Sequence, residues 1–254
     1  MGELRRRPLV IAHRGACKYA PENTLSALTK AIALGVDGVE IDVQLTRDKV
    51  PVVLHENALH AVTTTYRFVH QTPLRALQTI DVGAPFGTQP TRERIPTLAE
   101  ALETLRPSPL LLNIEIKAQP HWHFGIEDRV VRSVRDGGMS PRTIFSSFSP
   151  MVLMRLRYLA PQIPRALLIG PGAFSFFQAQ FFGRVMNVSN IHCCERRLTP
   201  KLLAMAAANG WQRWVWTINT RAEAERVLAL GIDGIITDDP LLIREVIGTA
   251  AHGI

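Results

Sequence analysis

A long internal repeat constrains the fold of this chain more than any other feature. The segment APENTLSALTKAIALGVDGVEID at 20–42 matches WTINTRAEAERVLALGIDGIITD at 216–238, at a constant offset of 196 residues. Each copy predicts a helix followed by a short buried strand, because apolar residues recur at helical spacing and then run together in a β-branched stretch. Two such units near opposite ends of one chain favour a closed barrel of alternating strands and helices.

The predicted helix ends support this interpretation. Asn23–Thr24 and Asn219–Thr220 supply residue types that cap helix N-termini, and Glu223 completes a capping box with Thr220. Gly35 and Gly231 suit the left-handed position at which helices end. Both copies therefore carry start and stop signals at equivalent places.

Nine strands are predicted for the eight places of such a barrel. They are residues 9–13, 39–43, 51–55, 110–117, 143–148, 165–170, 186–192, 213–218 and 235–238. The surplus strand is one of the two at 39–43 and 51–55, because the connector TRDK between them is too short for a crossover helix. These segments form either a hairpin or an extended return into a parallel strand, and both options bring His55 near Glu40 and Asp42.

The expected architecture is an α/β fold, a TIM (β/α)8 barrel built by residues 1–254 as a single domain. A short insertion, roughly residues 57–95, follows the strand that ends at His55. The next helix begins with a capping box formed by Thr97 and Glu100.

Charge and cysteine content restrict the partners and the compartment. The net charge of +7 favours anionic partners such as phosphate groups, acidic lipid surfaces or nucleic acid. No basic run is interleaved with stacking aromatic residues, so we expect no nucleic-acid binding. Three cysteines, two of them adjacent, argue against a disulfide framework and for the cytoplasm. We expect neither a transmembrane span nor a secretory signal.

Acidic residues on the predicted strands point to a cation site. Strand alternation places Glu40 and Asp42 on one face of their strand, and Glu115 and Lys117 on one face of another. Buried carboxylates are costly unless they are paired or bind a cation. Ligation by oxygen alone favours Mg²⁺ or Ca²⁺ over zinc. The alternative is an ordinary buried ion network in which Glu40 pairs with Lys117 or Arg14.

A set of ordered motifs resembles a known family. IAHRGACKYAPENT, GVDGVEIDVQLTRDKVPVVLH, IPTL, NIEIK and GIDGIITDDP, spread from Val10 to Asp239, together look like the glycerophosphodiester phosphodiesterase family. That family has a TIM barrel related to phosphatidylinositol-specific phospholipase C. The resemblance implies a phosphoric diester hydrolase that converts glycerophosphodiesters to sn-glycerol 3-phosphate and an alcohol. The attacking group would be water or the substrate's own glycerol 2-hydroxyl.

The resemblance also assigns roles to residues. By similarity, His13 and His55 form the general acid–base pair. One divalent cation would be held by Glu40, Asp42 and Glu115. The phosphate would be contacted by Arg14 and Lys117, and Trp216 would lie near the bound alcohol. The chain departs from the family where Glu56 and ALHAVTTT follow His55, since family members usually have Asp and then Leu-x-Arg-Thr there. That departure concerns substrate contacts more than the metal ligands.

Other functions remain open from sequence. The same site could act on lysophospholipids as a lysophospholipase D, and the rivals are a non-catalytic anion-binding barrel and a sugar-phosphate isomerase. His121 and His123 are interpreted as loop residues near the mouth of the barrel. The phenylalanine-rich segment 174–182 is expected on the catalytic face, where it holds a lipid chain, contacts the inner membrane surface or forms a dimer contact. Alternatively, it is a helix packed over the barrel.

Overall fold

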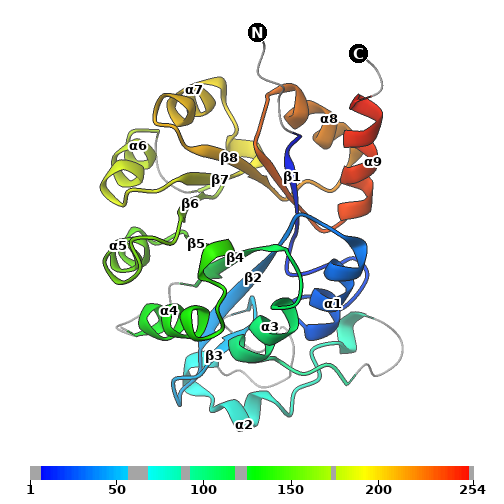
Figure 1. The fold of residues 1–254 in the computed structure, drawn as a ribbon, viewed down its shortest axis with the longest axis vertical. Coiled ribbons are helices and arrows are strands. Elements are labelled where there is room, and N and C mark those ends of the chain that lie inside the picture. The colour runs from blue at the N-terminus through cyan, green and yellow to red at the C-terminus, as the bar shows by residue number, and fades with distance from the viewer. Residues whose placement is uncertain (1–6, 57–67, 87–91, 118–124, 173–175, 252–254) are drawn as a thin grey trace.

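In the computed structural model, eight parallel strands close into a barrel inside a ring of helices (Figure 1). The structure describes residues 7–56, 68–86, 92–117, 125–172 and 176–251. The barrel strands are β1 (Leu9–Ala12), β2 (Gly38–Leu45), β4 (Leu111–Ile116), β5 (Thr143–Ser147), β6 (Arg165–Ile169), β7 (Asn190–Cys194), β8 (Gln212–Trp216) and β9 (Gly234–Thr237). The barrel closes because β1 pairs in parallel with both β2 and β9. The predicted TIM barrel is confirmed.

Each barrel strand is followed in the chain by a helix of the outer ring. These helices are α1 (Leu25–Leu34), α3 (Leu98–Leu105), α4 (Ile126–Asp136), α5 (Pro150–Leu159), α6 (Phe176–Val185), α7 (Pro200–Ala208), α8 (Arg221–Ala229) and α9 (Pro240–Ala251). Their apolar faces pack on outward-facing strand residues, as Leu28 and Leu153 do in one cluster with Val39 and Ile114. Between β2 and α3 the described chain adds β3 (Pro51–Val53) and the short helix α2 (Leu74–Leu77).

The surplus strand forms a hairpin with β2. β3 pairs antiparallel to β2, with Val43 opposite Val53, and the backbone amide of Leu54 then donates to the carbonyl of Asp42 at 2.9 Å. This settles the alternative that the sequence left open. The hairpin brings His55 back beside the C-terminal end of β2.

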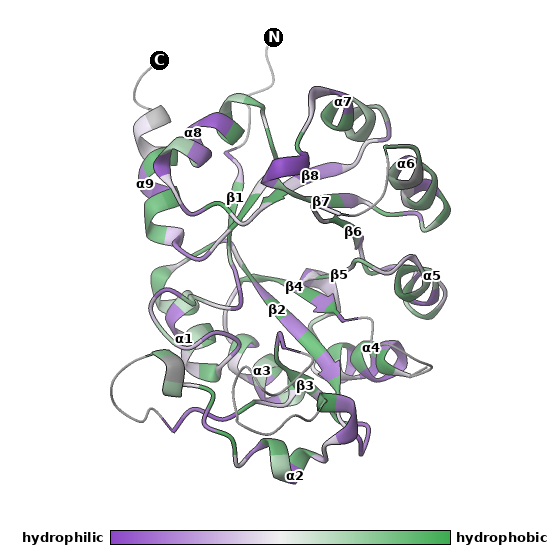
Figure 2. Cartoon of the chain, turned by 180° about the vertical axis from the view of Figure 1, so that it is seen from behind, coloured by the Kyte–Doolittle hydropathy of each residue, from purple (hydrophilic) through white to green (hydrophobic). Residues whose placement is uncertain are grey.

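β2 shows how the strands sort their side chains. All eight of its residues are buried, yet hydrophobic and hydrophilic residues alternate along it (Figure 2). Val39, Ile41 and Val43 belong to the core under the helices, so Glu40 and Asp42 face the barrel interior. The closed barrel therefore buries carboxylates that a one-sided sheet would expose.

The repeat behaves as predicted at its helix ends. The Thr24 hydroxyl accepts the backbone N–H of Ala27, and Thr220 forms a full capping box with Glu223. Gly35 and Gly231 have φ values of 62° and 66°, which favour glycine. The capping box of Thr97 with Glu100 is present as well.

One boundary prediction needs correction. The strand expected at 186–192 is β7, which begins only at Asn190, because the preceding residues close the last turn of α6. The backbone N–H of Met186 donates to Phe182 and that of Val188 to Gly183, so this apolar stretch ends a helix. Residues 176–182 of the expected catalytic-face segment also lie in α6, within the outer ring, whereas 174 and 175 lie outside the described residues.

The helix alternative for this segment is correct only in part. Phe176 and Phe182 pack against the core, whereas Phe177 and Phe181 are exposed. Within the described ranges, none of the helices has the length and apolar character that crossing a bilayer would require.

We predict that Gly38→Ala lowers the free energy of unfolding by about 1–3 kcal/mol, because overpacking forces neighbouring atoms apart. A Cβ at Gly38 would lie 2.8 Å from the carbonyl oxygen of Leu111 and 2.9 Å from Cδ1 of Ile11. Urea unfolding followed by circular dichroism measures the change. Gly248→Ala in α9 is the matched control, since no atom lies within 4 Å of the added Cβ. Equal stability of Gly38→Ala and the unchanged protein would contradict the prediction.

Candidate active site

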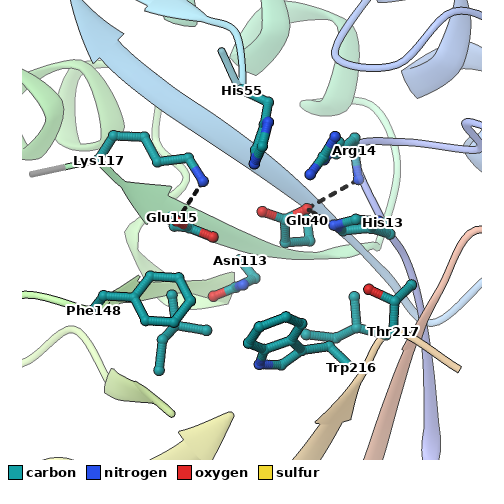
Figure 3. A pocket seen from close by; sticks show the side chains of 12 residues that line it. His13, Arg14, Glu40, His55, Asn113, Glu115, Lys117, Phe148, Trp216 and Thr217 are labelled. Atoms are coloured by element: carbon teal, nitrogen blue, oxygen red, sulfur yellow. Dashed lines mark hydrogen bonds and ion pairs between the residues drawn. The ribbon is translucent and has the colours of Figure 1, made fainter. Parts of the chain in front are cut away.

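A cavity opens at the C-terminal ends of the barrel strands, where parallel strands bring their last residues together (Figure 3). Its volume is about 170 Å³. It is lined by His13, Arg14, Glu40, His55, Asn113, Glu115, Lys117, Phe148, Leu168, Trp216, Thr217 and Ile236. Seven of the eight site residues named from the sequence are in this set. The eighth, Asp42, lies immediately behind the cavity wall and is 1% exposed.

Three carboxylates converge at this cavity. Glu40, Asp42 and Glu115 each place an oxygen within 4.8 Å of the others. Burial and the neighbouring charge of Asp42 raise the pKa of Glu40 to about 8. Burial and Asp42 also raise the pKa of Glu115. The cluster therefore carries more negative charge than its surroundings tolerate in the absence of a further cation.

Two basic side chains offset part of this charge. Lys117 Nζ lies 2.8 Å from Asp42 and 2.5 Å from Glu115, and Arg14 Nε lies 3.4 Å from Asp42. Burial pushes the pKa of Asp42 upward, but Lys117 and Arg14 outweigh it and hold that pKa at about 2. The predicted ion network thus exists around Asp42, and neither of these cationic side chains pairs with Glu40.

Glu40 is the carboxylate that the network leaves incomplete. Its Oε2 accepts the backbone N–H of Arg14 at 3.0 Å, whereas its buried Oε1 has no hydrogen-bond partner among the described residues. An unpaired buried carboxylate oxygen beside two other carboxylates fits a hard divalent cation. The donor set is therefore suited to the metal that the sequence predicts.

The tight turn after β1 explains the sequence HRG. Arg14 has a φ of 53° and Gly15 a φ of 77°, so the chain reverses over two residues. A Cβ at Gly15 would lie 2.8 Å from the backbone carbon of Ala27, which leaves room only for glycine. This turn directs Arg14 into the cavity next to His13.

His13 is oriented by Asp238, a residue that the sequence analysis missed. Its Nδ1 donates to Asp238 Oδ1 at 2.6 Å, and its Nε2 lies 4.0 Å from Glu40. Burial lowers the pKa of His13, but the hydrogen bond to Asp238 and the charge of Glu40 outweigh it, so the pKa lies above its usual value. The repeat could have identified this residue, because its offset aligns Asp238 with Asp42.

Cys17 contacts the same carboxylate. Its thiol donates to Asp238 Oδ1 at 3.2 Å, and burial together with Asp238 raises the pKa of the thiol. A protonated, hydrogen-bonded thiol is a poor nucleophile.

His55 is held by its own loop. Gln44 Nε2 donates to the carbonyls of Leu54, His55 and Glu56, which fixes the turn after β3. His55 Nδ1 lies 3.0 Å from Glu56 Oε1. Glu56, the residue that departs from the family pattern, thus contacts the ring that lines the cavity.

Aromatic side chains form the opposite wall, below the charged groups in Figure 3. The rings of Phe148 and Trp216 meet edge to face at 5.8 Å, and Trp216 Nε1 donates to the carbonyl of His192. A second, larger cavity shares His13 and Arg14 with the first and is also lined by Cys17, Lys18, Pro21, Glu22, Glu56, Val82, Phe86 and Asp238. His121 and His123 lie outside the described residues.

Comparisons with known proteins agree with this geometry. The family model described as the glycerophosphoryl diester phosphodiesterase family matches residues 13–242. A glycerophosphodiester phosphodiesterase of Caldanaerobacter subterraneus is 36% identical over 92% of this chain and 95% of its own length.

Solved structures agree as well. A crystal structure from Silicibacter pomeroyi has a TM-score of 0.89 at 27% identity and covers 98% of this chain and 96% of its own. An Oleispira antarctica phosphodiesterase in complex with the product sn-glycerol-3-phosphate has a TM-score of 0.82 at 30% identity, with coverage of 95% and 97%. The chain therefore belongs to the glycerophosphoryl diester phosphodiesterase family and is a phosphoric diester hydrolase, as the sequence motifs indicate.

Proposed function

We propose that this protein hydrolyses glycerophosphodiesters to sn-glycerol 3-phosphate and an alcohol with the help of one divalent cation. The observation that carries the proposal is the convergence of two imidazoles, His13 and His55, with Glu40 and Glu115 around one cavity. The relative bound to sn-glycerol-3-phosphate supports the same product. An anion-binding barrel needs no pair of titrating rings, and a sugar-phosphate isomerase would release no alcohol.

Glu40, Asp42 and Glu115 would hold the cation, which is Mg²⁺ or Ca²⁺ because all three ligands are carboxylates. When bound, the cation supplies positive charge that neutralises the phosphoryl oxygens. Arg14 and Lys117 add fixed positive charge at the cavity wall. These groups together offset the repulsion between the diester and the site's own carboxylates.

The two histidines exchange protons with the reacting oxygens. Asp238 holds Nδ1 of His13, so Nε2 is the nitrogen directed toward Glu40 and the cavity. An imidazole titrates near neutrality, so one ring can accept a proton while the other donates one to the departing alcohol. Asp238 acts as a positioning residue, because it touches the ring and not the reacting atoms.

The diester has two arms, and two cavities meet at His13 and Arg14. The smaller cavity, with Trp216 and Phe148, presents apolar surface that suits the carbon atoms of glycerol, so Trp216 would contact the glycerol arm and not the departing alcohol that the resemblance suggests. The larger, open cavity suits an alcohol of variable size. A panel of head groups, including lysophospholipids, compares diesterase activity with lysophospholipase D activity at this site.

We predict that His13→Ala lowers turnover by about 10²–10⁴-fold, because a positioned acid or base typically contributes that much. The enzymatic release of glycerol 3-phosphate from glycerophosphocholine measures the loss. His70→Ala serves as the matched control, since His70 does not line the cavity. Near-normal turnover of a folded His13→Ala variant would exclude the assigned role.

We predict that Asp238→Asn lowers the pKa of His13, because it removes the carboxylate that raises this pKa. A histidine whose pKa is higher in the folded protein than its usual value of 6.5 stabilises the fold fully at pH values below 6.5. This stabilisation is lost as the pH rises through the pKa of the folded protein. The variant should therefore lose more stability near pH 6 than near pH 9. NMR titration of the ring and urea unfolding at both pH values measure these effects. Asp233→Asn is the control, since Asp233 pairs with Arg213; an unchanged His13 pKa in Asp238→Asn would contradict the prediction.

We predict that Mg²⁺ or Ca²⁺ raises the melting temperature of the unchanged protein, because a ligand that binds only the folded state stabilises it. Glu115→Gln should abolish most of this increase, and EDTA should abolish hydrolysis. Glu103→Gln is the control, because its side chain is 78% exposed and remote from the cluster. If calorimetric titration gave Glu115→Gln and Glu103→Gln equal affinity for the cation, Glu115 would not be one of its ligands.

A further inference from the structure

The positive charge of this chain is concentrated in one segment. Residues 137–222 contain ten lysines and arginines but one acidic residue, Glu195, which gives a net charge of +9. The remainder of the chain has 19 basic and 21 acidic residues, a net charge of −2. The segment covers the part of the barrel from β5 to β8, including the outer helices α5, α6 and α7.

Exposed apolar side chains gather on the same part of the molecule. Ten large hydrophobic side chains of the described residues are exposed, and six of them come from β5–α5 and α6: Phe148, Met151, Met154, Tyr158, Phe177 and Phe181. Most monomeric surfaces scatter such residues singly. The helices α5 and α6 are neighbours in the outer ring, as both views show (Figures 1 and 2).

The spacing aligns these residues along the two helices. Met151, Met154 and Tyr158 are three and four residues apart, and Phe177 and Phe181 are four apart, so each group forms one stripe. Phe177 is 72% exposed and Tyr158 is 87% exposed. We call the surface formed by these five residues the α5–α6 face.

Cations border the α5–α6 face. Lys201, at the start of α7, places Nζ 4.4 Å from the ring centre of Phe176 and 5.5 Å from that of Phe177. Arg157 hydrogen-bonds to the carbonyl of Val185 and so joins α5 to α6. The helices α5, α6 and α7 contain no aspartate or glutamate, although Arg155 of α5 pairs with Asp128 and Glu127 of α4.

The α5–α6 face also reaches the mouth of the active site. In a barrel of this kind, the first turn of each helix lies at the C-terminal end of the strands. Met151 is the second residue of α5 and Phe177 is the second residue of α6, so both lie at that end of the barrel. Phe148, just before α5, is exposed and lines the catalytic cavity. Apolar surface therefore continues from the cavity to the outer helices.

We propose that the α5–α6 face docks on an anionic lipid surface. Aromatic and methionine side chains beside lysine and arginine are the combination that binds membrane interfaces, where apolar groups enter the headgroup region and cations meet acidic lipids. A second copy of this chain is a poorer occupant, because two such faces would bring two strongly positive segments together. The proposal goes beyond the hydrolysis and is tested without it.

The experiment compares vesicle binding of matched surface variants. Co-sedimentation uses vesicles of phosphatidylcholine with roughly one quarter phosphatidylglycerol, at about 0.05 M and about 0.5 M salt, and vesicles of phosphatidylcholine alone. The unchanged protein should bind the anionic vesicles, and binding should fall at high salt. Phe177→Ser/Phe181→Ser should weaken binding by about tenfold or more. Lys201→Gln should weaken it about fivefold, because it removes one surface charge.

The control removes exposed apolar groups elsewhere. Leu230→Ser/Leu241→Ser changes two exposed leucines at α8 and α9 and should bind as the unchanged protein does. Thermal unfolding establishes that each variant is folded. The proposal is overturned if anionic vesicles do not bind, or if both double variants bind equally. It is also overturned if light scattering shows a dimer that Phe177→Ser/Phe181→Ser dissociates while vesicle binding is absent.

Discussion

The crowding of three carboxylates inside a closed barrel is the constraint around which this site is built. Glu40, Asp42 and Glu115 approach within 4.8 Å because β2 and β4 are adjacent and in register, with Asp42 opposite Glu115. Such a cluster is stable only with counter-charge. Lys117 provides part of it at Asp42 and Glu115, and the unpaired oxygen of Glu40 leaves the rest to a cation. Fold stability and the proposed metal binding would therefore depend on the same atoms.

The internal repeat contributes to the chemistry as well as to the fold. In the first copy, Asn23 donates to Asp42 at 2.9 Å and accepts its backbone N–H at 3.2 Å. In the second copy, Asn219 donates to Asp238 at 2.5 Å and accepts its backbone N–H at 2.9 Å. The same two-point contact thus orients one aspartate toward the carboxylate cluster and its equivalent toward His13. One local solution to positioning an aspartate at a strand end serves two different roles.

The sequence predicts the parts of this arrangement that depend on local periodicity. Strand alternation correctly places Glu40 and Asp42 on one face, and the caps at Thr24 and Thr220 are observed. The hairpin of β2 and β3 could not be distinguished from a parallel return, because both give the same alternation. Residues around Met186 look like a strand but end α6, since an apolar β-branched run fits either structure.

Asp238 was missed because its partner His13 is 225 residues away. The roles of the eight site residues, His13, Arg14, Glu40, Asp42, His55, Glu115, Lys117 and Trp216, stay predictions that the geometry supports.

The distribution of charge resolves an apparent conflict in the site. An anionic diester must approach a cavity that contains buried carboxylates, and Coulomb repulsion would slow that approach if the rest of the molecule were neutral. On the side of the mouth formed by β7 and α7, Arg196 and Arg197 come just after β7, and Lys201 lies in the first turn of α7. These cations attract anions toward the mouth, and Lys117 and Arg14 partly neutralise the carboxylate cluster behind it. In the proposed function, the carboxylates would bind the cation, while the basic residues at the mouth would attract the anionic substrate.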